Sequence, residues 1–326
     1  MLDELVDVRE NTLIKIDYSL LDILLKDRTT KKNILWGTDM YHSRGSEFSP
    51  DSEILVYQIT GRNGQVIKPR VKKSIADQEK RIRTKAEVFT PAWICNIQNN
   101  LYDAQWFGRD NVFNETIDKT WKSIESKIVF PQNRSWIDYI KSLRIEISCG
   151  EAPYLVSRYD STSGDVLSPK DRIGLLDRKL RIVSENVESI EEWISYAKIA
   201  YKSTYGFEWQ GDSLLIAREN LLYTFVDFFY DKFSIVPEKD ILEEIAEIIS
   251  WNIFQMDGTK CVVPYSCKKN DIIKYTLFGE EITHNECPGC KKNDIYKHNG
   301  MYVKIMDWDK NKKVKFVSLL GKEVNL

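Results

Sequence analysis

The sequence predicts a mixed α/β protein in which helices connect the strands of a parallel sheet. Strand-like and helix-like stretches alternate from about residue 140 to 260, a pattern typical of this class. Hydrophobic residues make up 42% of the 326 residues and charged residues 29%, which excludes disordered, collagen-like and small disulfide-stabilised chains. No apolar run is long enough to predict a transmembrane helix.

Composition also limits the expected compartment and partners. The chain has 47 basic and 49 acidic residues, a net charge of −2. This near-neutral balance argues against coating nucleic acid by bulk attraction, but it allows a local basic patch. The acidic N-terminus lacks the layout of a signal peptide. We therefore expect a cytoplasmic protein without a membrane partner, whose six cysteines are free thiols or metal ligands.

Residues 1–80 form the first of three predicted regions, a helical and hairpin region. The apolar spacing within the first 35 residues predicts a helix. Residues 54–70 predict a β-hairpin, because β-forming residues flank the turn signal at 61–64.

A basic segment follows this region. It raises two interpretations, a solvated helix face or a strip that contacts the phosphates of DNA. Its basic residues are Lys68, Arg70, Lys72, Lys73, Lys80, Arg81, Arg83 and Lys85.

Residues 81–260 form the predicted cofactor-binding domain. Strands are expected near 143–149, 205–208 and 252–257, and helices over 178–203, 213–232 and 240–251. The carboxyl ends of parallel strands share one edge of a sheet, where nucleotides bind. The first strand ends at a turn with Gly150, whose small size admits a ligand. The second ends at Glu208, which can accept hydrogen bonds from ribose hydroxyls. The third ends at Asp257, which can accept a hydrogen bond from an adenine amine.

These segments, in this order, resemble a known family. The matching stretches are 85–91, which ends Phe-Thr-Pro, 146–150 (Glu-Ile-Ser-Cys-Gly), Glu208 with the Ala-Arg-Glu-Asn-Leu-Leu helix at 217–222, and 252–257. The chain is similar over roughly residues 80–260 to the adenine-specific, amino-group DNA methyltransferases of bacterial restriction–modification systems. The resemblance implies a Rossmann-like sheet that binds S-adenosylmethionine.

The resemblance also implies roles for seven residues. Glu208 would accept hydrogen bonds from the ribose hydroxyls, and Asp257 one from the adenine amino group. The other five would surround the methionine portion: Phe89, Thr90, Pro91, Glu146 and Gly150.

The sequence departs from the family in two places. The turn after Cys149 lacks the usual second glycine, and it contains Glu151, which suits a cationic ligand, and Pro153. The second departure is the family's catalytic tetrapeptide, Asn/Asp-Pro-Pro-aromatic, which holds the target base. No Pro-Pro occurs in the sequence, so no catalytic residue is assigned.

We therefore expect an incomplete methyltransferase sheet. Residues 314–320 resemble the lead-in to the strand that carries the tetrapeptide. The resemblance implies that a partner polypeptide supplies the catalytic motif and the target recognition. Two alternatives remain, an inactive methyltransferase-like module that binds DNA or a partner, and an enzyme that uses another nucleotide cofactor.

The third region, 261–326, contains a cysteine-rich insert. Cys287-Pro-Gly-Cys290 has the two-residue spacing of a zinc knuckle, and Cys267 and His298 are the expected remaining ligands of a structural zinc. Cys261 lies in an apolar run, and His284 is a rival fourth ligand. Unpaired thiols and a redox dithiol are the other interpretations of this spacing.

Overall fold

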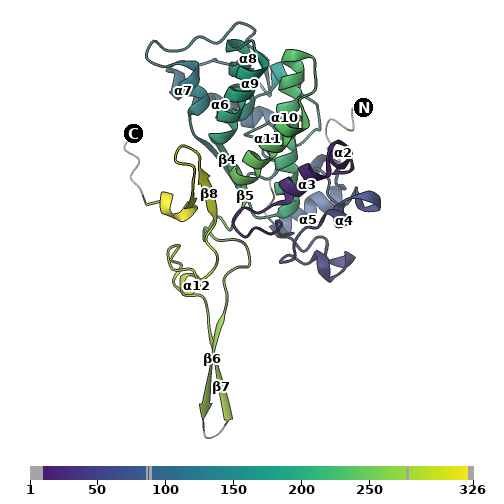
Figure 1. Cartoon of the computed structure of the whole chain (residues 1–326), viewed down its shortest axis with the longest axis vertical. Helices are drawn as coiled ribbons and strands as arrows, with labels where there is room; N and C mark the ends of the chain where they lie inside the picture. The colour runs from purple at the N-terminus through teal and green to yellow at the C-terminus, as the bar shows by residue number, and fades with distance from the viewer. Residues whose placement is uncertain (1–9, 86, 88–89, 277–278, 322–326) are drawn as a thin grey trace.

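The protein is a mixed α/β structure, as the sequence predicts (Figure 1). The computed structural model describes residues 10–85, 87, 90–276 and 279–321. Within these ranges, no helix combines the length and the apolar character that crossing a membrane requires.

A three-stranded parallel sheet lies at the centre, in the order β3-β4-β5. Two helices follow β3 and two follow β4, so all three strands run in one direction and end at the same edge. All three predicted strands are present. The elements are β3 (Arg144–Ile147), α8 (Leu175–Asn186), α9 (Ile190–Lys202), β4 (Thr204–Glu208), α10 (Gly211–Phe233), α11 (Lys239–Asn252) and β5 (Ile253–Gln255).

A buried arginine forms hydrogen bonds that connect the elements of this α/β unit. Arg218 on α10 is fully buried, and its Nε donates to the carbonyl of Ile253 on β5 at 2.8 Å. Its other nitrogens donate to Ser250, at the end of α11, and to Lys26, at the end of an N-terminal helix. Burial lowers the pKa of Arg218 to about 9. Through these hydrogen bonds, Arg218 joins α10 to the start of β5, the end of α11 and the N-terminal region.

Two predicted helices are each interrupted. The N-terminal one is α2 (Glu10–Ile16) and α3 (Tyr18–Leu25), separated by Asp17, whose carboxylate caps α3 by accepting from the N–H of Ser19 at 2.7 Å. The helix predicted over 178–203 is α8 and α9, because Ser189 caps α9 in the same way. Side-chain caps compete with helix continuation at both places.

The predicted hairpin over 54–70 is wrong. Residues 56–63 form the short helix α4 (Val56–Ile59) and a 3₁₀ turn. Gln58 is buried and accepts from the N–H of Leu55 at 2.8 Å, and the hydroxyl of Thr60 donates to the carbonyl of Val56 at 2.8 Å. These local bonds satisfy backbone groups that a hairpin would pair across strands.

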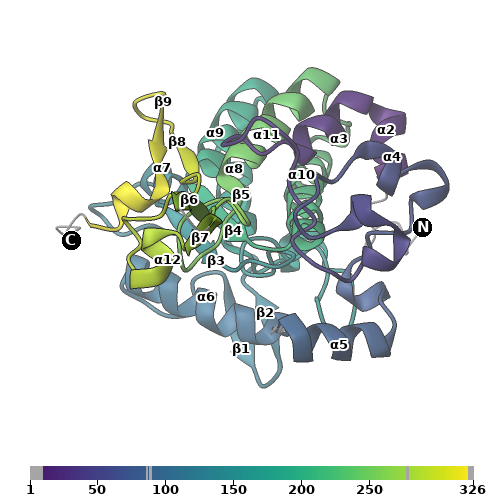
Figure 2. The ribbon, with the colours of Figure 1, turned by 90° about the horizontal axis from the view of Figure 1, so that it is seen from below.

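The rest of the N-terminal half supplies a rim beside the sheet. It contains α5 (Ile75–Lys85), α6 (Ala92–Phe107), the antiparallel pair β1 (Asn114–Ile117) and β2 (Thr120–Ser123), and α7 (Trp136–Lys141). Figure 2 shows α6 on the β3 side of the sheet.

The C-terminal region packs on one face of the sheet. It contains β6 (Asn270–Thr276), β7 (Gly279–Asn285), α12 (Pro288–Lys292), β8 (Lys304–Asp307) and β9 (Lys312–Lys315). A small core joins Val303, Ile305 and Val317 to Phe207 on β4 and Phe254 on β5. Residues 312–315 pair with β8 in a separate antiparallel sheet, and a 3₁₀ helix, Phe316–Leu319, follows them.

Candidate functional site

A cleft of about 910 Å³ opens at the carboxyl ends of β3 and β4. It is lined by four of the seven residues predicted to bind a cofactor: Thr90, Glu146, Gly150 and Glu208. Residues 98, 99 and 102 on α6 form the facing wall. The predicted strand ends at Gly150 and Glu208 therefore meet at one site.

Glu208 joins the ends of the first two strands. One carboxylate oxygen accepts from the N–H of Gly150 at 2.9 Å, and the other accepts from the N–H groups of Trp209 at 2.8 Å and Gln210 at 3.1 Å. Burial raises the pKa of Glu208, although these N–H groups oppose the shift. The oxygen that accepts from Gly150 keeps a lone pair for a ligand, whereas the other oxygen already accepts two hydrogen bonds.

Glu146 places a second acid in the cleft. Its two oxygens accept from the N–H groups of Tyr154 at 3.4 Å and Leu155 at 3.2 Å. Burial raises the pKa of Glu146 well above its ordinary value, and the nearby Glu208 adds to the shift. The protein thus keeps two buried acids close together. Hydrogen bonds offset only part of the free-energy cost of ionising them.

The turn after β3 has an uncommon backbone. Ser148, Gly150 and Ala152 all have positive φ, at 51°, 52° and 64°. Two of them carry a Cβ, so the turn is held in a region that L-residues rarely adopt. The Glu151 carboxylate is buried away from the cleft, where it accepts from the N–H of Arg70 and the hydroxyl of Tyr159. The Glu151 carboxylate therefore does not face a ligand in the cleft, although the sequence suggested that its charge suits a cationic ligand.

The remaining predicted cofactor residues do not join the cleft. Phe89 is outside the described residues. Pro91 begins α6, next to Thr90, but does not line the cleft. Asp257 lies in a tight turn, where its carboxylate accepts from the backbone and the hydroxyl of Thr259 and pairs with Lys260 at 3.1 Å. This local bonding holds Asp257 outside the cleft lining.

Residues that the sequence did not single out complete the cleft. The rings of Trp209 and Tyr265 meet at 5.4 Å and 71°, and both line the cleft beside Glu208. Three buried polar atoms of lining residues have no hydrogen-bond partner: Glu87 Oε1, Asn99 Oδ1 and Ser213 Oγ. Unpartnered buried polar atoms are uncommon in proteins, and these three belong to residues at the cleft.

The charge of the cleft discriminates between ligand classes. Its described lining contains three carboxylates, those of Glu87, Glu146 and Glu208, and no Lys, Arg or His. Two amides beside the cleft are already occupied, because Gly150 donates to Glu208, and Gly211, the first residue of α10, donates to the carbonyl of Trp36. The site therefore suits a cationic, hydroxyl-bearing ligand better than a dinucleotide.

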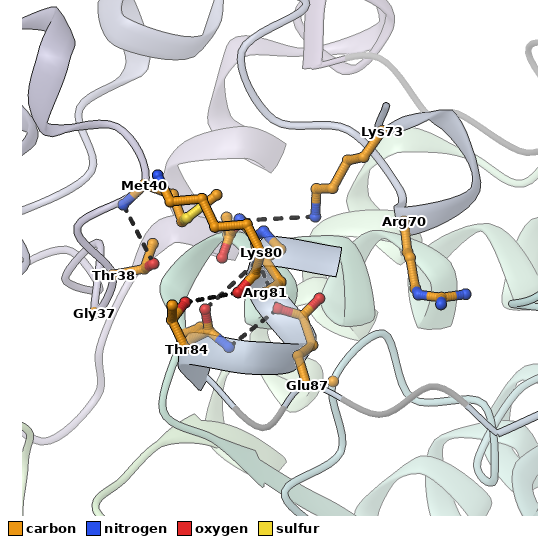
Figure 3. Close-up of polar contacts among 12 residues, drawn as sticks. Gly37, Thr38, Met40, Arg70, Lys73, Lys80, Arg81, Thr84 and Glu87 are labelled. Atoms are coloured by element: carbon orange, nitrogen blue, oxygen red, sulfur yellow. Dashed lines mark hydrogen bonds and ion pairs between the residues drawn. The ribbon is translucent and has the colours of Figure 1, made fainter. Parts of the chain in front are cut away.

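The basic segment at 68–85 divides into buried and exposed residues. Arg81 is 2% exposed and forms ion pairs with Asp212 and with Glu87, the latter at 2.8 Å, as Figure 3 shows for Glu87. Lys73 lies 3.8 Å from Asp212 and is also nearly buried. Arg83 is exposed. The interpretation as a strip that contacts DNA phosphates is wrong for Arg81 and Lys73, because both side chains pair with Asp212 in the interior.

This buried cluster connects α5 to the cleft. Asp212, in the first turn of α10, accepts from the hydroxyl of Tyr41 at 2.8 Å as well as pairing with Arg81. Burial opposes its ionisation, yet Arg81 and Lys73 lower the pKa of Asp212 to about 2. Arg81 also holds Glu87, so the ion pairs position one acid of the cleft wall.

The predicted metal ligands converge. The ligand atoms of Cys267, Cys287, Cys290 and His298 all lie within 4.8 Å of one another. His298 Nδ1 lies 3.6, 3.5 and 3.6 Å from the three sulfurs in that order. Tetrahedral zinc with ordinary Zn–S and Zn–N bonds requires a separation of about 3.6 Å between nitrogen and sulfur. The four residues therefore fit a zinc ion.

Further contacts favour these four ligands. The N–H of Asn299 donates to Cys287 Sγ at 3.2 Å. Burial opposes the thiolate, but hydrogen bonds to the sulfur lower the pKa of Cys287 to about 6. Cys261 is buried in the small C-terminal core, away from the cluster. His284 lies on β7, whose side chains are outside the described part.

Comparisons with protein-family models, curated proteins and solved structures found no match to this chain.

Arg81→Glu should destabilise the fold strongly, because it places a carboxylate beside Asp212 and Glu87 in the interior. We expect a loss of about 3–5 kcal/mol in the free energy of unfolding, measured with urea. Arg83→Glu, a matched reversal at an exposed position of the same helix, should change it by less than about 1 kcal/mol. Equal effects of the two reversals would contradict the buried role of Arg81.

The Cys/His cluster should bind one zinc ion per chain. Metal analysis of the purified protein should give a ratio near one, and Cys287→Ser or His298→Ala should lower both the metal content and the thermal stability. Cys95→Ser, a control at a buried thiol outside the cluster, should leave the metal content unchanged. Full zinc content in the two ligand variants would exclude this ligand set.

Glu146→Gln should change how stability depends on pH. The raised pKa of buried Glu146 means that ionisation opposes folding, so the wild-type protein loses stability as pH rises above about 4.3, the ordinary Glu value. The variant lacks this loss, and its free energy of unfolding relative to wild type should increase from pH 4 to pH 7. Glu125→Gln, at an exposed acid, should show no such trend. A pH-independent difference for Glu146→Gln would count against the shift.

Proposed function

We propose that the cleft binds S-adenosylmethionine and that the chain is the cofactor-binding part of an adenine-specific DNA methyltransferase of a restriction–modification system. On this proposal the parallel sheet is an incomplete Rossmann-like methyltransferase sheet. The observation that carries it is the cleft at the strand ends, which has carboxylates at Glu146 and Glu208 and no basic side chain in its described lining. S-adenosylmethionine carries a sulfonium and an ammonium group but no phosphate.

The lining residues match the parts of this cofactor. Glu208 would accept hydrogen bonds from the ribose hydroxyls, since charge-assisted acceptance is strong. The adjacent rings of Trp209 and Tyr265 offer a surface to the adenine base. Glu146 would attract the ammonium and sulfonium groups, whereas the charge of Glu87 is already paired with Arg81. When bound, the cofactor supplies an electrophilic methyl group.

The seven roles implied by the resemblance are thereby revised. Thr90, Glu146, Gly150 and Glu208 keep their proposed places beside the cofactor. Asp257 is bonded to Thr259 and Lys260, so we no longer assign it the adenine amine.

We propose that a partner polypeptide carrying the catalytic tetrapeptide docks along β3. β3 pairs with β4 only, among the described strands, and Ile145 and Ile147 are 45% and 70% exposed. They lie on the sheet face that the C-terminal core covers over Phe207 of β4, and they line the cleft. A partner covering them would complete a wall of the same cleft.

The second candidate is a catalytically inactive module that binds DNA or a restriction partner. It is favoured by the sequence's lack of Pro-Pro and by the strained turn at Ser148 and Ala152. Methyl transfer to adenine by the purified chain alone would exclude this candidate. Cofactor binding without transfer is the result expected if a partner is needed.

Glu208→Gln should weaken S-adenosylmethionine binding by about 10- to 100-fold, because loss of a charge-assisted hydrogen bond costs about 1.5–3 kcal/mol. Isothermal titration calorimetry with S-adenosylmethionine measures this directly. NAD, titrated in parallel, should give no heat, since the cleft offers its phosphates no basic side chain.

Glu125→Gln provides the matched control, because it makes the same change at an exposed acid. It should bind like the wild-type protein. The proposal fails if the wild-type protein gives no heat with S-adenosylmethionine, or if Glu208→Gln binds as the wild type does.

A further inference from the structure

The hairpin formed by β8 and β9 carries three lysines on one exposed face. Figure 2 shows this hairpin projecting from the molecule beside α11. Lys304 lies directly opposite Lys315, and Lys313 lies two residues before Lys315, on the same face of the hairpin. All three side chains are exposed, and together they form the lysine face. Like charges directly opposite each other destabilise paired strands, so stability alone does not account for this arrangement.

Aromatic rings support two of these lysines without neutralising them. The ammonium group of Lys313 lies 5.1 Å from the ring centroid of Trp251, and that of Lys315 lies 5.4 Å from the ring centroid of Tyr302. Such contacts attract a cation but leave its charge in place. Within the described ranges, none of the three lysines forms an ion pair with a carboxylate. The positive charge of the lysine face therefore remains available to a partner.

A turn of the N-terminal region extends the basic surface. The hydroxyl of Thr29 accepts from the N–H of Lys304 at 3.0 Å and donates to the carbonyl of Lys304 at 3.4 Å, so the turn lies against β8. The turn brings the exposed Lys31 to this surface, together with Arg28, whose guanidinium carbon lies 5.9 Å from the ring centroid of Trp251. The surface thus combines two segments that are distant in the sequence.

Acidic residues offset only part of this charge. Residues 26–32 and 304–315 contain nine basic and three acidic residues. Two further acids, Glu53 and Glu247, pair with basic residues of the first segment from outside. Nine positive charges against five negative ones leave an excess of four. An excess of this size on one exposed surface favours a polyanion as the partner.

The placement of the lysines favours the backbone of duplex DNA. Lysine provides a compact point charge, which suits contacts with phosphates that carry no sequence information. Lys313 and Lys315 are about 6.8 Å apart along β9, and B-DNA carries one charge per about 1.7 Å of its axis, so each lysine can reach a phosphate. Anionic membranes instead attract basic clusters on amphipathic helices, whereas these lysines lie on a β-hairpin.

We propose that Lys304, Lys313 and Lys315 contact the phosphates of duplex DNA independently of its base sequence, with Arg28 and Lys31 beside them. None of these residues is in the described lining of the cleft, so the DNA surface and the cofactor site are separate. This inference rests on the proposed function only in taking DNA as the partner.

The first test measures how DNA binding depends on salt. Fluorescence anisotropy with a labelled duplex of about 30 base pairs gives the binding constant between 50 and 200 mM salt. Changing all three residues of the lysine face to Gln should lower the affinity at least tenfold at 50 mM salt. It should also reduce the slope of log K against log salt by about 2–3, at about 0.9 per phosphate. A second duplex of unrelated sequence should show the same loss, because phosphates carry no sequence information.

The matched control makes the same charge change at three exposed lysines elsewhere on the chain: Lys122, Lys141 and Lys170. This control variant should bind both duplexes as the wild-type protein does, with an unchanged salt slope.

The second test separates DNA binding from stability. Lys304→Glu places an acid opposite Lys315, so it should raise the melting temperature of the protein by about 1–2 °C. The same change should lower the affinity for DNA further than Lys304→Gln does, because it adds repulsion of the phosphates. A purely structural role for Lys304 would not give higher stability together with weaker binding.

Three outcomes would overturn the inference. They are no binding of duplex DNA by the wild-type protein, equal binding by the lysine-face variant and its control, and a loss confined to one of the two duplexes. Vesicles of phosphatidylcholine with phosphatidylserine should bind the wild-type protein no better than the lysine-face variant. Vesicle binding that requires the lysine face, with DNA binding unaltered, would assign this surface to a membrane instead.

Calorimetry with S-adenosylmethionine distinguishes this inference from the proposed function. The lysine-face variant should bind the cofactor as the wild-type protein does. Normal cofactor binding with unaltered DNA binding would refute the DNA surface alone, and DNA binding through the lysine face without cofactor binding would refute the proposed cofactor alone.

Discussion

The hydrogen bonds to the Glu208 carboxylate are the constraint on which the candidate site depends. They connect Gly150, at the end of β3, with Trp209 and Gln210, at the start of the next crossover. Two strand ends are therefore fixed by one buried acid. The same bonds occupy three backbone amides beside the cleft and place a carboxylate there, which disfavours a phosphate at this point. Burial makes this arrangement costly for the carboxylate, as its raised pKa indicates.

Sequence reasoning succeeded where spacing along the chain determines geometry. The three parallel strands and the long helices α10 and α11 have strong local patterns, and they are present. The ligand set of Cys267, Cys287, Cys290 and His298 follows from a knuckle whose two sulfurs must face one point. The predictions from sequence were wrong where one side-chain hydrogen bond determines the local structure. Gln58 and Thr60 form such bonds in the segment predicted to be a hairpin. Asp17 and Ser189 cap new helices where one continuous helix was predicted. Such choices depend on tertiary burial, which no short window contains.

Charge was the least predictable property. In the sequence, Arg81 and Arg83 are equivalent members of one basic segment. In the fold, two residues of separation turn Arg81 inward to Asp212 and leave Arg83 in solvent, since successive helix positions face different directions. Asp257 shows the same limitation, because its turn offers the hydroxyl of Thr259 and the ammonium of Lys260 as nearer partners than a ligand. Trp209 and Tyr265 lie 56 positions apart, so no motif could reveal that their rings meet.

The covering of the sheet explains why the cleft is open on one side. The C-terminal core buries Phe207 of β4 and Phe254 of β5, but it ends before β3, where Ile145 and Ile147 on the same face remain exposed. Parallel sheets are normally covered on both faces, because their strands are apolar on both. The uncovered strand is also the one whose turn is strained and whose Glu146 is buried without a cation. An unfinished apolar surface and an unneutralised acid thus occur together on β3, and a second polypeptide with a cationic cofactor would satisfy both.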